Sequence, residues 1–348
     1  MRVLPGYSLP MKMTVLSDGG WGTALALTLR GNGHDVRLWG PFPDYLAEIR
    51  SRHENVRFLP GVPLPAELVI EADLARAVAD AGLVVLAAPA QYLRGLLDKL
   101  RPVMPAGALY VSVAKGIEVG SLLRMSELVR DRLGDAVRLT ILSGPSHAEE
   151  VARQVPTAVV AASAVPADAV LAQTAFMNAT FRVYTSDDVT GVELGGALKN
   201  VLALAAGMCD GLELGDNSKA ALMTRGLAEM ARLGKALGGR PETFFGLSGV
   251  GDLIVTCASR HSRNRRVGEA LGRGQSLAEI ERDLGGMVAE GVPTAASAQA
   301  LARRTGAETP LIDAVHAVLY EGKAPQAAAR DLMMRTAKPE IPPGFLAG

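Results

Sequence analysis

The stretch Met13-Thr-Val-Leu-Ser-Asp-Gly-Gly-Trp-Gly22 decides how the chain begins to fold. Its apolar start predicts a short buried strand over residues 13–17, and the glycines turn the chain into a helix over residues 23–30. Gly31-Asn-Gly-His34 ends that helix, and Asp35-Val-Arg-Leu-Trp39 predicts a second strand. This strand, turn, helix and strand form the unit in which backbone amides at a helix N-terminus approach a dinucleotide pyrophosphate. The pattern therefore favours a dinucleotide-binding domain over a turn without a ligand.

The glycine fingerprint of this turn is incomplete. Gly19 and Gly22 occupy the second and third positions of the G-x-G-x-x-G pattern, but Ser17 stands at the first. The second strand runs into Gly40-Pro-Phe-Pro-Asp44. Its tip carries neither the acid that holds a ribose 2′-hydroxyl nor an arginine for a 2′-phosphate, so NAD and NADP are both candidates.

The alternation of strands and helices continues. Helices are predicted near residues 91–101, 120–133 and 167–178, and further strands at residues 83–87, 109–113, 139–142, 157–161 and 181–184. Ligands of an open parallel sheet bind beyond the carboxyl ends of its strands, where Lys115 and the stretch Ser143-Gly-Pro-Ser146 lie. Lys115 is thus placed to meet an anion, and a solvated lysine in a loop is the alternative.

After Tyr184 the pattern predicts helices near residues 189–208, 217–238, 252–258, 264–272, 276–284, 293–306, 311–321 and 325–335. The first of these is apolar on nearly every side, which predicts burial, yet it contains Lys199 and Asn200. A buried ammonium costs several kcal/mol unless it is paired or its pKa falls. A desolvated lysine can exchange a proton with a hydroxyl group. The alternative is a lysine whose ammonium reaches solvent at the edge of the domain.

Two further polar stretches lie in the helical half. Gly246-Leu-Ser-Gly-Val-Gly-Asp252 leads to Asp252 and, one helical turn later, Thr256. This carboxylate could orient Lys199, and the hydroxyl could bind a substrate oxygen, with helix capping as the alternative role. Ser262-Arg-Asn-Arg-Arg266 combines guanidinium, amide and hydroxyl donors, which suit a phosphate monoester, although a solvated loop would explain it too.

The composition narrows the possible function classes. The chain has 348 residues, enough for two domains. Its 36 basic residues balance its 36 acidic ones, which disfavours nucleic-acid binding. Cys209 and Cys257 follow no metal-ligand spacing and suggest no disulfide framework, so we expect a cytoplasmic protein. The chain lacks a run of about eighteen consecutive apolar residues, which disfavours membrane insertion. Residues 1–12 and 339–348 are expected to be tails.

The chain resembles the NAD(P)-dependent glycerol-3-phosphate dehydrogenases of bacteria from Met13 to about Leu319. The segments that carry the resemblance are Gly22-Thr-Ala-Leu-Ala26, Val113-Ala-Lys-Gly-Ile-Glu118, Leu142-Ser-Gly-Pro-Ser146, residues 191–200, residues 215–226, residues 246–257 and Ser262-Arg-Asn264. It implies an α/β fold of the 6-phosphogluconate-dehydrogenase-like type. A Rossmann-like, mostly parallel sheet domain over residues 13–190 precedes an all-α substrate domain over residues 191–338. It further implies that the protein interconverts sn-glycerol 3-phosphate and dihydroxyacetone phosphate with NAD or NADP and supplies glycerolipid synthesis. The apolar helical half predicts a homodimer, and we expect no metal.

The resemblance also assigns roles to residues. Lys199 becomes the proton acceptor, joined as catalytic residues by Lys115, Asp252 and Thr256. The implied substrate-binding residues are Lys115, Gly144, Lys199, Asn200, Asp252, Ser262, Arg263 and Asn264. The implied cofactor-contacting residues are Gly19, Gly20, Trp21, Gly22, Lys115, Gly144, Ser146, Ala148, Arg263, Val288 and Glu290. Ser17 departs from the family pattern, and so does Pro41, which falls where many members place a basic residue near the adenosine ribose.

Two alternative functions follow from the same residues. A dehydrogenase of the same plan could act on an unphosphorylated hydroxy acid, although the basic run that begins at Ser262 speaks against it. A non-catalytic dinucleotide-binding sensor is conceivable because of Ser17. The joint presence of Lys199, Asp252 and Arg263 is hard to explain in a protein without chemistry.

Overall fold

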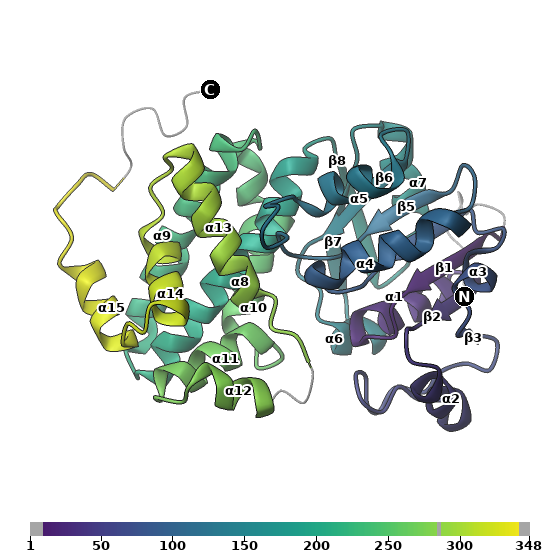
Figure 1. Ribbon diagram of the computed structural model, residues 1–348, viewed down its shortest axis with the longest axis horizontal. Helices are drawn as coiled ribbons and strands as arrows, with labels where there is room; N and C mark the ends of the chain where they lie inside the picture. The colour runs from purple at the N-terminus through teal and green to yellow at the C-terminus, as the bar shows by residue number, and fades with distance from the viewer. Residues whose placement is uncertain (1–9, 284–286, 341–348) are drawn as a thin grey trace. The chain divides into compact units, whose positions relative to one another are not determined.

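A computed structural model describes residues 10–283 and 287–340 of the chain (Figure 1). The chain divides into two compact units, of which the first holds the residues up to Ala114 together with Met125–Val189. The second holds Lys115–Arg124 and the residues from Thr190 onward. The segment that carries Lys115 therefore groups with the helical unit, whereas the sequence had placed it in the sheet domain. The predicted tails lie largely outside the described residues.

The first unit is built on an eight-stranded sheet of order β3-β2-β1-β4-β5-β6-β7-β8. Its strands are β1 Lys12–Leu16, β2 Asp35–Trp39, β3 Val69–Glu71, β4 Leu83–Leu86, β5 Leu109–Ser112, β6 Arg138–Ser143, β7 Thr157–Ala162 and β8 Phe181–Ser186. All neighbouring strands are parallel except β6 and β7. The predicted Rossmann-like, mostly parallel sheet is confirmed. β1 lies between β2 and β4, so the strand order reverses there and the carboxyl end of β1 is where such sheets bind ligands.

Seven α-helices accompany the sheet in the described part of the first unit. They are α1 Gly20–Gly31, α2 Pro43–Arg52, α3 Leu74–Val78, α4 Ala90–Leu100, α5 Met125–Leu133, α6 Ala148–Ala152 and α7 Pro166–Phe176. Ala24, Leu25 and Leu29 of α1 are fully buried in the same apolar core as β1 and β2. The helix predicted from residue 120 was wrong in its first turn. It begins only at Met125, because Gly120 and Leu122 have φ values of +86° and +61°, which right-handed helices exclude.

The described part of the second unit is helical. After α8 Val189–Gly211 come α9 Gly215–Ala236, a π-helical turn Leu247–Gly251, α10 Asp252–Ala258, α11 Arg263–Gly272, α12 Leu277–Asp283, α13 Gly291–Thr305, α14 Pro310–Tyr320 and α15 Pro325–Met333. Helix α8 forms the core, as predicted, and is buried from Gly191 to Met208. A Cβ at Gly207 would lie 1.9 Å from the carbonyl oxygen of Arg265, so this glycine lets α11 pack closely against α8.

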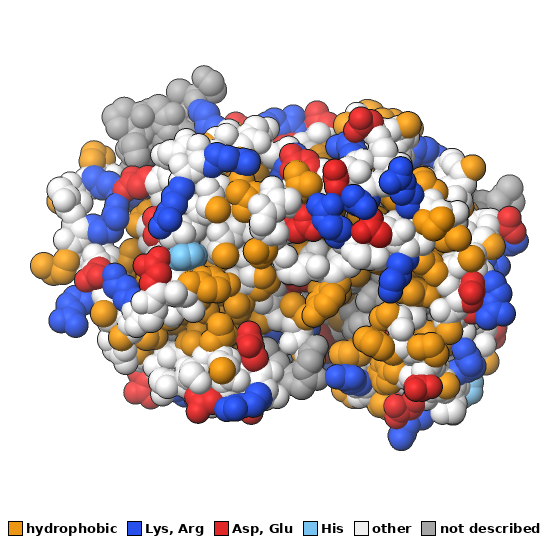
Figure 2. Space-filling view, viewed as in Figure 1, with side chains coloured by type: hydrophobic (Ala, Val, Ile, Leu, Met, Phe, Trp, Pro, Cys, Tyr) orange, Lys and Arg blue, Asp and Glu red, His pale blue; other side chains and the backbone are white. Residues whose placement is uncertain are grey.

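Helix α8 is also long and apolar enough to cross a membrane. Its most apolar window is 94% buried within the protein, which is typical of the core helix of a packed unit. The space-filling view shows basic and acidic side chains interspersed over the face drawn (Figure 2). The neutral net charge therefore does not conceal one broad basic surface on that face.

Candidate functional site

A cluster of three charged side chains and one hydroxyl lies in the helical unit, around Asp252. The Nζ atom of Lys115 lies 2.7 Å from Oδ2 of Asp252, and the Nζ atom of Lys199 lies 2.9 Å from Oδ1. Lys199 also donates a hydrogen bond of 2.7 Å to the hydroxyl of Thr256, which itself donates to Asp252 over 3.3 Å. The structure thus brings together the four residues that the sequence proposed for catalysis. Helix capping and a solvent-reaching lysine do not describe this arrangement, since Lys199 is only 7% exposed and Asp252 1%.

The surroundings of Lys199 hold its pKa well below the usual range of a lysine. Burial lowers the pKa of Lys199 to about 8, with a further contribution from the ammonium of Lys115, while Asp252 acts in the opposite direction. Burial alone would raise the pKa of Asp252, but the charges of Lys115 and Lys199 outweigh it and lower that pKa. Asp252 therefore stays ionised while the amine of Lys199 can gain and lose a proton.

The glycine-rich turn before Asp252 is required by packing. A Cβ at Gly249 would lie 2.0 Å from the carbonyl oxygen of Phe244, and a Cβ at Gly195 of α8 would lie 2.5 Å from that of Ser248. Both glycines allow the backbone of the turn to approach its neighbours. The turn therefore lies directly against α8, the helix that carries Lys199, and delivers Asp252 at the first position of α10.

The segment that carries Lys115 is fixed to the helical unit at several points. Asn200 of α8 donates to the carbonyl oxygen of Lys115 over 3.1 Å. Arg124, at the other end of the segment, lies 2.5 Å from Glu193 of α8, and the hydroxyl of Ser297 lies 3.3 Å from the carbonyl oxygens of both Ile117 and Glu118. Local sequence patterns did not predict these contacts of Arg124, Glu193 and Ser297. A signal was available, because Glu193 is a carboxylate within the apolar helix and needs a partner when buried.

The basic run after α10 divides into structural and exposed members. Ser262 caps α11 by accepting a hydrogen bond of 3.2 Å from the backbone N–H of Arg265. The Nε atom of Arg265 lies 2.6 Å from Asp210, so this arginine is engaged within the helical unit. Arg263, the first residue of α11, and Arg266 are exposed. Arg263 therefore has solvent access at the N-terminus of α11, and its role in anion binding stays a prediction.

Asn264 joins three helices of the same unit. Its Nδ2 donates to Oδ1 of Asn200 over 2.9 Å, and its Oδ1 accepts from the backbone N–H of Gly291 over 2.9 Å. Val288 and Glu290 lie immediately before α13 and are half-buried. The predicted substrate residues Asn200 and Asn264 therefore already hold α8, α11 and the start of α13 together.

The first unit contains the turn predicted to hold the dinucleotide. A Cβ at Gly22 would lie 2.2 Å from the carbonyl oxygen of Ser17, and a Cβ at Gly20 would lie 2.4 Å from that of Phe58, so neither position tolerates a side chain. In the part of the chain that the structure describes, no side chain caps the N-terminus of α1, whose N-cap is Gly19. Ser17 has a φ of +149°, a conformation that favours glycine, and its hydroxyl accepts a 3.2 Å hydrogen bond from the backbone N–H of Gly19. Ser17 thus adopts the positive φ that a fingerprint glycine would supply, and the backbone amides at the start of α1 stay without a capping side chain among the described residues, as a pyrophosphate site would need.

The remaining predicted residues of the first unit follow β6. Gly144 has a φ of +138°, and a Cβ there would lie 2.9 Å from the Cα of Val159. The hydroxyl of Ser146 donates to the carbonyl oxygen of Gly144 over 2.9 Å. The Cβ of Ala148, the first residue of α6, lies 3.8 Å from the Cβ position of Gly20. The fingerprint turn and α6 therefore lie side by side, as expected for residues that share a ligand.

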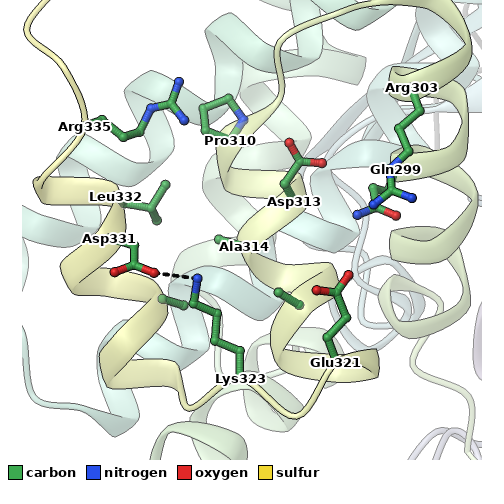
Figure 3. Close-up of a pocket in the computed structure, with 12 residues that line it drawn as sticks. Gln299, Arg303, Pro310, Asp313, Ala314, Glu321, Lys323, Asp331, Leu332 and Arg335 are labelled. Atoms are coloured by element: carbon green, nitrogen blue, oxygen red, sulfur yellow. Dashed lines mark ion pairs between the residues drawn. The ribbon is translucent and has the colours of Figure 1, made fainter.

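A separate pocket of about 390 Å³ lies over α13, α14 and α15 of the helical unit (Figure 3). Its charged rim is partly paired, with the Nζ atom of Lys323 2.6 Å from Asp331. Neither Lys115 nor Lys199 lines it. Among the described residues, no group of three His, Cys, Asp or Glu side chains could hold a metal ion.

Comparison with known proteins identifies the family. The family model described as the N-terminus of NAD-dependent glycerol-3-phosphate dehydrogenase matches residues 12–169, and the one described as its C-terminus matches residues 188–330. The chain belongs to the NAD-dependent glycerol-3-phosphate dehydrogenase family. It is an NAD(P)-dependent dehydrogenase, and the resemblance stated from its motifs is confirmed.

Individual relatives match over nearly the whole chain. Glycerol-3-phosphate dehydrogenase [NAD(P)+] of Moorella thermoacetica is 50% identical over 332 residues, which are 95% of this chain and 98% of the relative. The enzyme of the same name from Chlorobium phaeobacteroides is 48% identical over 333 residues, or 95% and 99% of the two chains. The crystal structure of glycerol-3-phosphate dehydrogenase from Coxiella burnetii superposes with a TM-score of 0.90 at 39% identity and covers 94% of this chain and 99% of that one. A ketopantoate reductase from Ralstonia eutropha, at 16% identity and a TM-score of 0.58, shares the fold alone.

Proposed function

We propose that this family member interconverts sn-glycerol 3-phosphate and dihydroxyacetone phosphate, with Lys199 transferring the proton of the C2 hydroxyl. The observation that carries the proposal is the buried ammonium of Lys199, which Asp252 and Thr256 hold and whose pKa is lowered to about 8. The names of its relatives support the substrate pair. A bound nicotinamide dinucleotide would supply the hydride acceptor or donor, and the glycine turn before α1 would hold it.

Lys199 serves both directions of the reaction. When the alcohol is oxidised, its neutral amine takes the hydroxyl proton, and when the ketone is reduced, its ammonium returns a proton to the oxygen. Oxidation should therefore become faster as pH rises through about 8, and reduction should become slower. Asp252 keeps the amine in place, and the hydroxyl of Thr256 accepts one of its N–H groups.

The substrate phosphate would be held by donors at the start of α11. Arg263 is exposed there, and Ser262 and Asn264 flank it. Lys115 adds a second positive charge to the cluster that contains Lys199. Gly144 and Asn200 complete the substrate set that the family resemblance assigns. A guanidinium supplies several charge-assisted bonds of fixed geometry, which suits a phosphate monoester.

The biological setting belongs to the same proposal. We place the protein in the cytoplasm as a homodimer that takes a small phosphorylated triose, supplies glycerolipid synthesis and needs no metal. The two free cysteines, Cys209 and Cys257, agree with a reducing compartment. The interspersed surface charges agree with a small-molecule substrate rather than a polyanion (Figure 2).

The decisive experiment is oxidation of NADH and of NADPH by the purified protein with dihydroxyacetone phosphate. Lys199→Ala should abolish turnover, whereas Lys235→Ala, which removes an exposed lysine of α9, should leave it unchanged. Turnover that survives in Lys199→Ala would reject the assigned proton donor. Activity on unphosphorylated hydroxy acids alone would favour the second dehydrogenase class, and dinucleotide binding without any turnover would favour a sensor.

A further inference from the structure

The tip of β2 lacks an acidic residue of its own, but an acid from elsewhere occupies its place. A Cβ at Gly40, directly after β2, would lie 2.5 Å from Cγ and 2.6 Å from Oδ2 of Asp18. The carboxyl group of Asp18 therefore fills the space that a side chain at position 40 would take. In Rossmann-like domains this end of the second strand carries the acid that binds the 2′-hydroxyl of the adenosine ribose.

Hydrogen bonds fix Asp18 at this position. The backbone N–H of Ser17 donates to the carbonyl oxygen of Trp39, the last residue of β2, over 3.0 Å. Asn55 donates to the carbonyl oxygen of Asp18 over 2.7 Å. The glycine-rich turn is thus tied to the end of β2, and the absence of a side chain at Gly40 gives the carboxyl group room.

The carboxyl group of Asp18 has an unused acceptor. Asp18 is 5% exposed, and its Oδ2 atom is buried without a hydrogen-bond partner in the described part of the chain. Burial raises the pKa of Asp18, while a hydrogen bond from its own backbone amide and the positive charge of Arg57 act in the opposite direction. A buried acceptor without a donor is unfavourable, and a hydroxyl group that donates to Oδ2 would remove that cost.

Unlike a 2′-hydroxyl, a ribose 2′-phosphate next to Oδ2 of Asp18 would be unfavourable. It offers acceptor oxygens and negative charge to a carboxyl group that needs a donor. Pro41, directly after Gly40, brings no positive charge to this point. The guanidinium of Arg57, whose charge acts on Asp18, stacks over the ring of Phe58, with its central carbon 5.1 Å from the ring centroid.

We propose that Asp18 selects the dinucleotide by accepting a hydrogen bond from the ribose 2′-hydroxyl and excluding a 2′-phosphate, so that the protein binds NAD(H) in preference to NADP(H). This inference rests on the proposed function and adds the cofactor preference that the sequence left open. It assigns a binding role to Asp18, which the glycine fingerprint treats as a variable position.

The test is equilibrium binding without substrate, followed by the fluorescence of NADH and NADPH. The wild-type protein should bind NADH at least about tenfold more tightly than NADPH. In Asp18→Ala this ratio should fall by about tenfold or more, because NADH loses a hydrogen bond while NADPH loses nothing. Asp35→Ala, which removes an exposed carboxylate at the start of β2, should leave the ratio unchanged.

Four outcomes would overturn the inference. Tighter binding of NADPH by the wild-type protein, or an unchanged ratio in Asp18→Ala, would reject the role of Asp18 and leave the proposed reaction intact. A protein that binds neither dinucleotide would reject the proposed function as well.

Asp18→Asn tests the inference if Asp18→Ala loses both dinucleotides because the turn is disturbed. Asparagine keeps the shape of the side chain and removes its charge. The affinity of this variant for NADPH should rise relative to wild type, and an unchanged affinity would count against the inference.

Discussion

Replacing Asp252 by asparagine would remove the carboxylate that lies between the ammonium groups of Lys115 and Lys199. These nitrogens lie 2.7 and 2.9 Å from its two oxygens, and Asp252 itself is 1% exposed. Asparagine has nearly the same shape, so the substitution changes charge and leaves the packing of the turn intact. Since Asp252 opposes the effect of burial on Lys199, its loss should lower the pKa of that lysine below its present value of about 8.

The size of the effect follows from the contact distance. An opposite charge in direct contact shifts a pKa by about 1 to 3 units. Loss of the Asp252 charge would therefore bring the pKa of Lys199 to between about 5 and 7. The protonated fraction at pH 7 would then fall from about nine-tenths to between about one-half and one-hundredth. Ketone reduction at pH 7 should fall by about twofold to a hundredfold from protonation alone. The fold should lose less than the ~3–5 kcal/mol typical of a broken buried pair, because Lys199 can release its proton.

The assay is the pH profile of kcat for the reduction of dihydroxyacetone phosphate. The alkaline limb of the profile should move to lower pH in Asp252→Asn. Thr256→Val is the matched control, because it removes the hydrogen-bonded hydroxyl and keeps the charge, so its limb should stay near that of the wild type. Circular dichroism would establish that both variants are folded. An alkaline limb that does not move in Asp252→Asn, in a folded protein, would refute the assignment of that limb to Lys199.

Three further substitutions test other parts of the structure. Arg124→Gln should leave Glu193 buried without its partner and lower the free energy of unfolding by about 3–5 kcal/mol. The KM should rise because the segment that carries Lys115 loosens, and an unchanged KM would contradict the anchoring role of Arg124. Ser17→Gly should stabilise the protein by about 1 kcal/mol in denaturant unfolding, because glycine suits the positive φ, and a loss of stability would contradict this. Burial raises the pKa of Glu229 to about 7, whereas the unfolded chain ionises this carboxyl group near 4.5. The free energy of unfolding of the wild type should therefore fall by up to about 3 kcal/mol as pH rises from about 4.5 to 7. Glu229→Gln should therefore gain stability relative to wild type over that range, and parallel stability curves would reject the effect.

Local patterns predicted the elements that rest on local interactions. The apolar run after Met13 and the glycines that follow it placed β1 and α1 to within a few residues, because strand pleating and helix starts depend on neighbouring residues. Burial of α8 followed from its continuous apolar surface, and a lysine within such a helix pointed to Lys199. The short strand β3 (Val69–Glu71) was missed, since three residues at a sheet edge leave almost no periodic signal.

Contacts between distant parts of the chain were beyond local patterns. The ion pair between Lys115 and Asp252 spans 137 positions, so only the folded chain shows that Lys115 belongs to the helical unit. Only the folded chain likewise shows which acidic side chain lies at the tip of β2. The sequence showed Gly40 and Pro41 there and no acid, whereas the carboxyl group of Asp18 reaches that point across the fold. The antiparallel pairing of β6 and β7 was likewise not foreseen, because a strand looks the same in either direction.

The inclusion of Lys115–Arg124 in the helical unit also affects when that unit can fold during synthesis and which fragments of the chain retain all of its contacts. During synthesis Lys115 leaves the ribosome long before Asp252, so the charged cluster can assemble only after both parts of the chain have been translated. A gene fragment that begins at Thr190 would encode Lys199 and Asp252 but not the second lysine or Arg124, and it would leave Glu193 buried without its partner. Cutting the chain at residue 190 would therefore remove Lys115 from the cluster around Asp252 and Arg124 from Glu193.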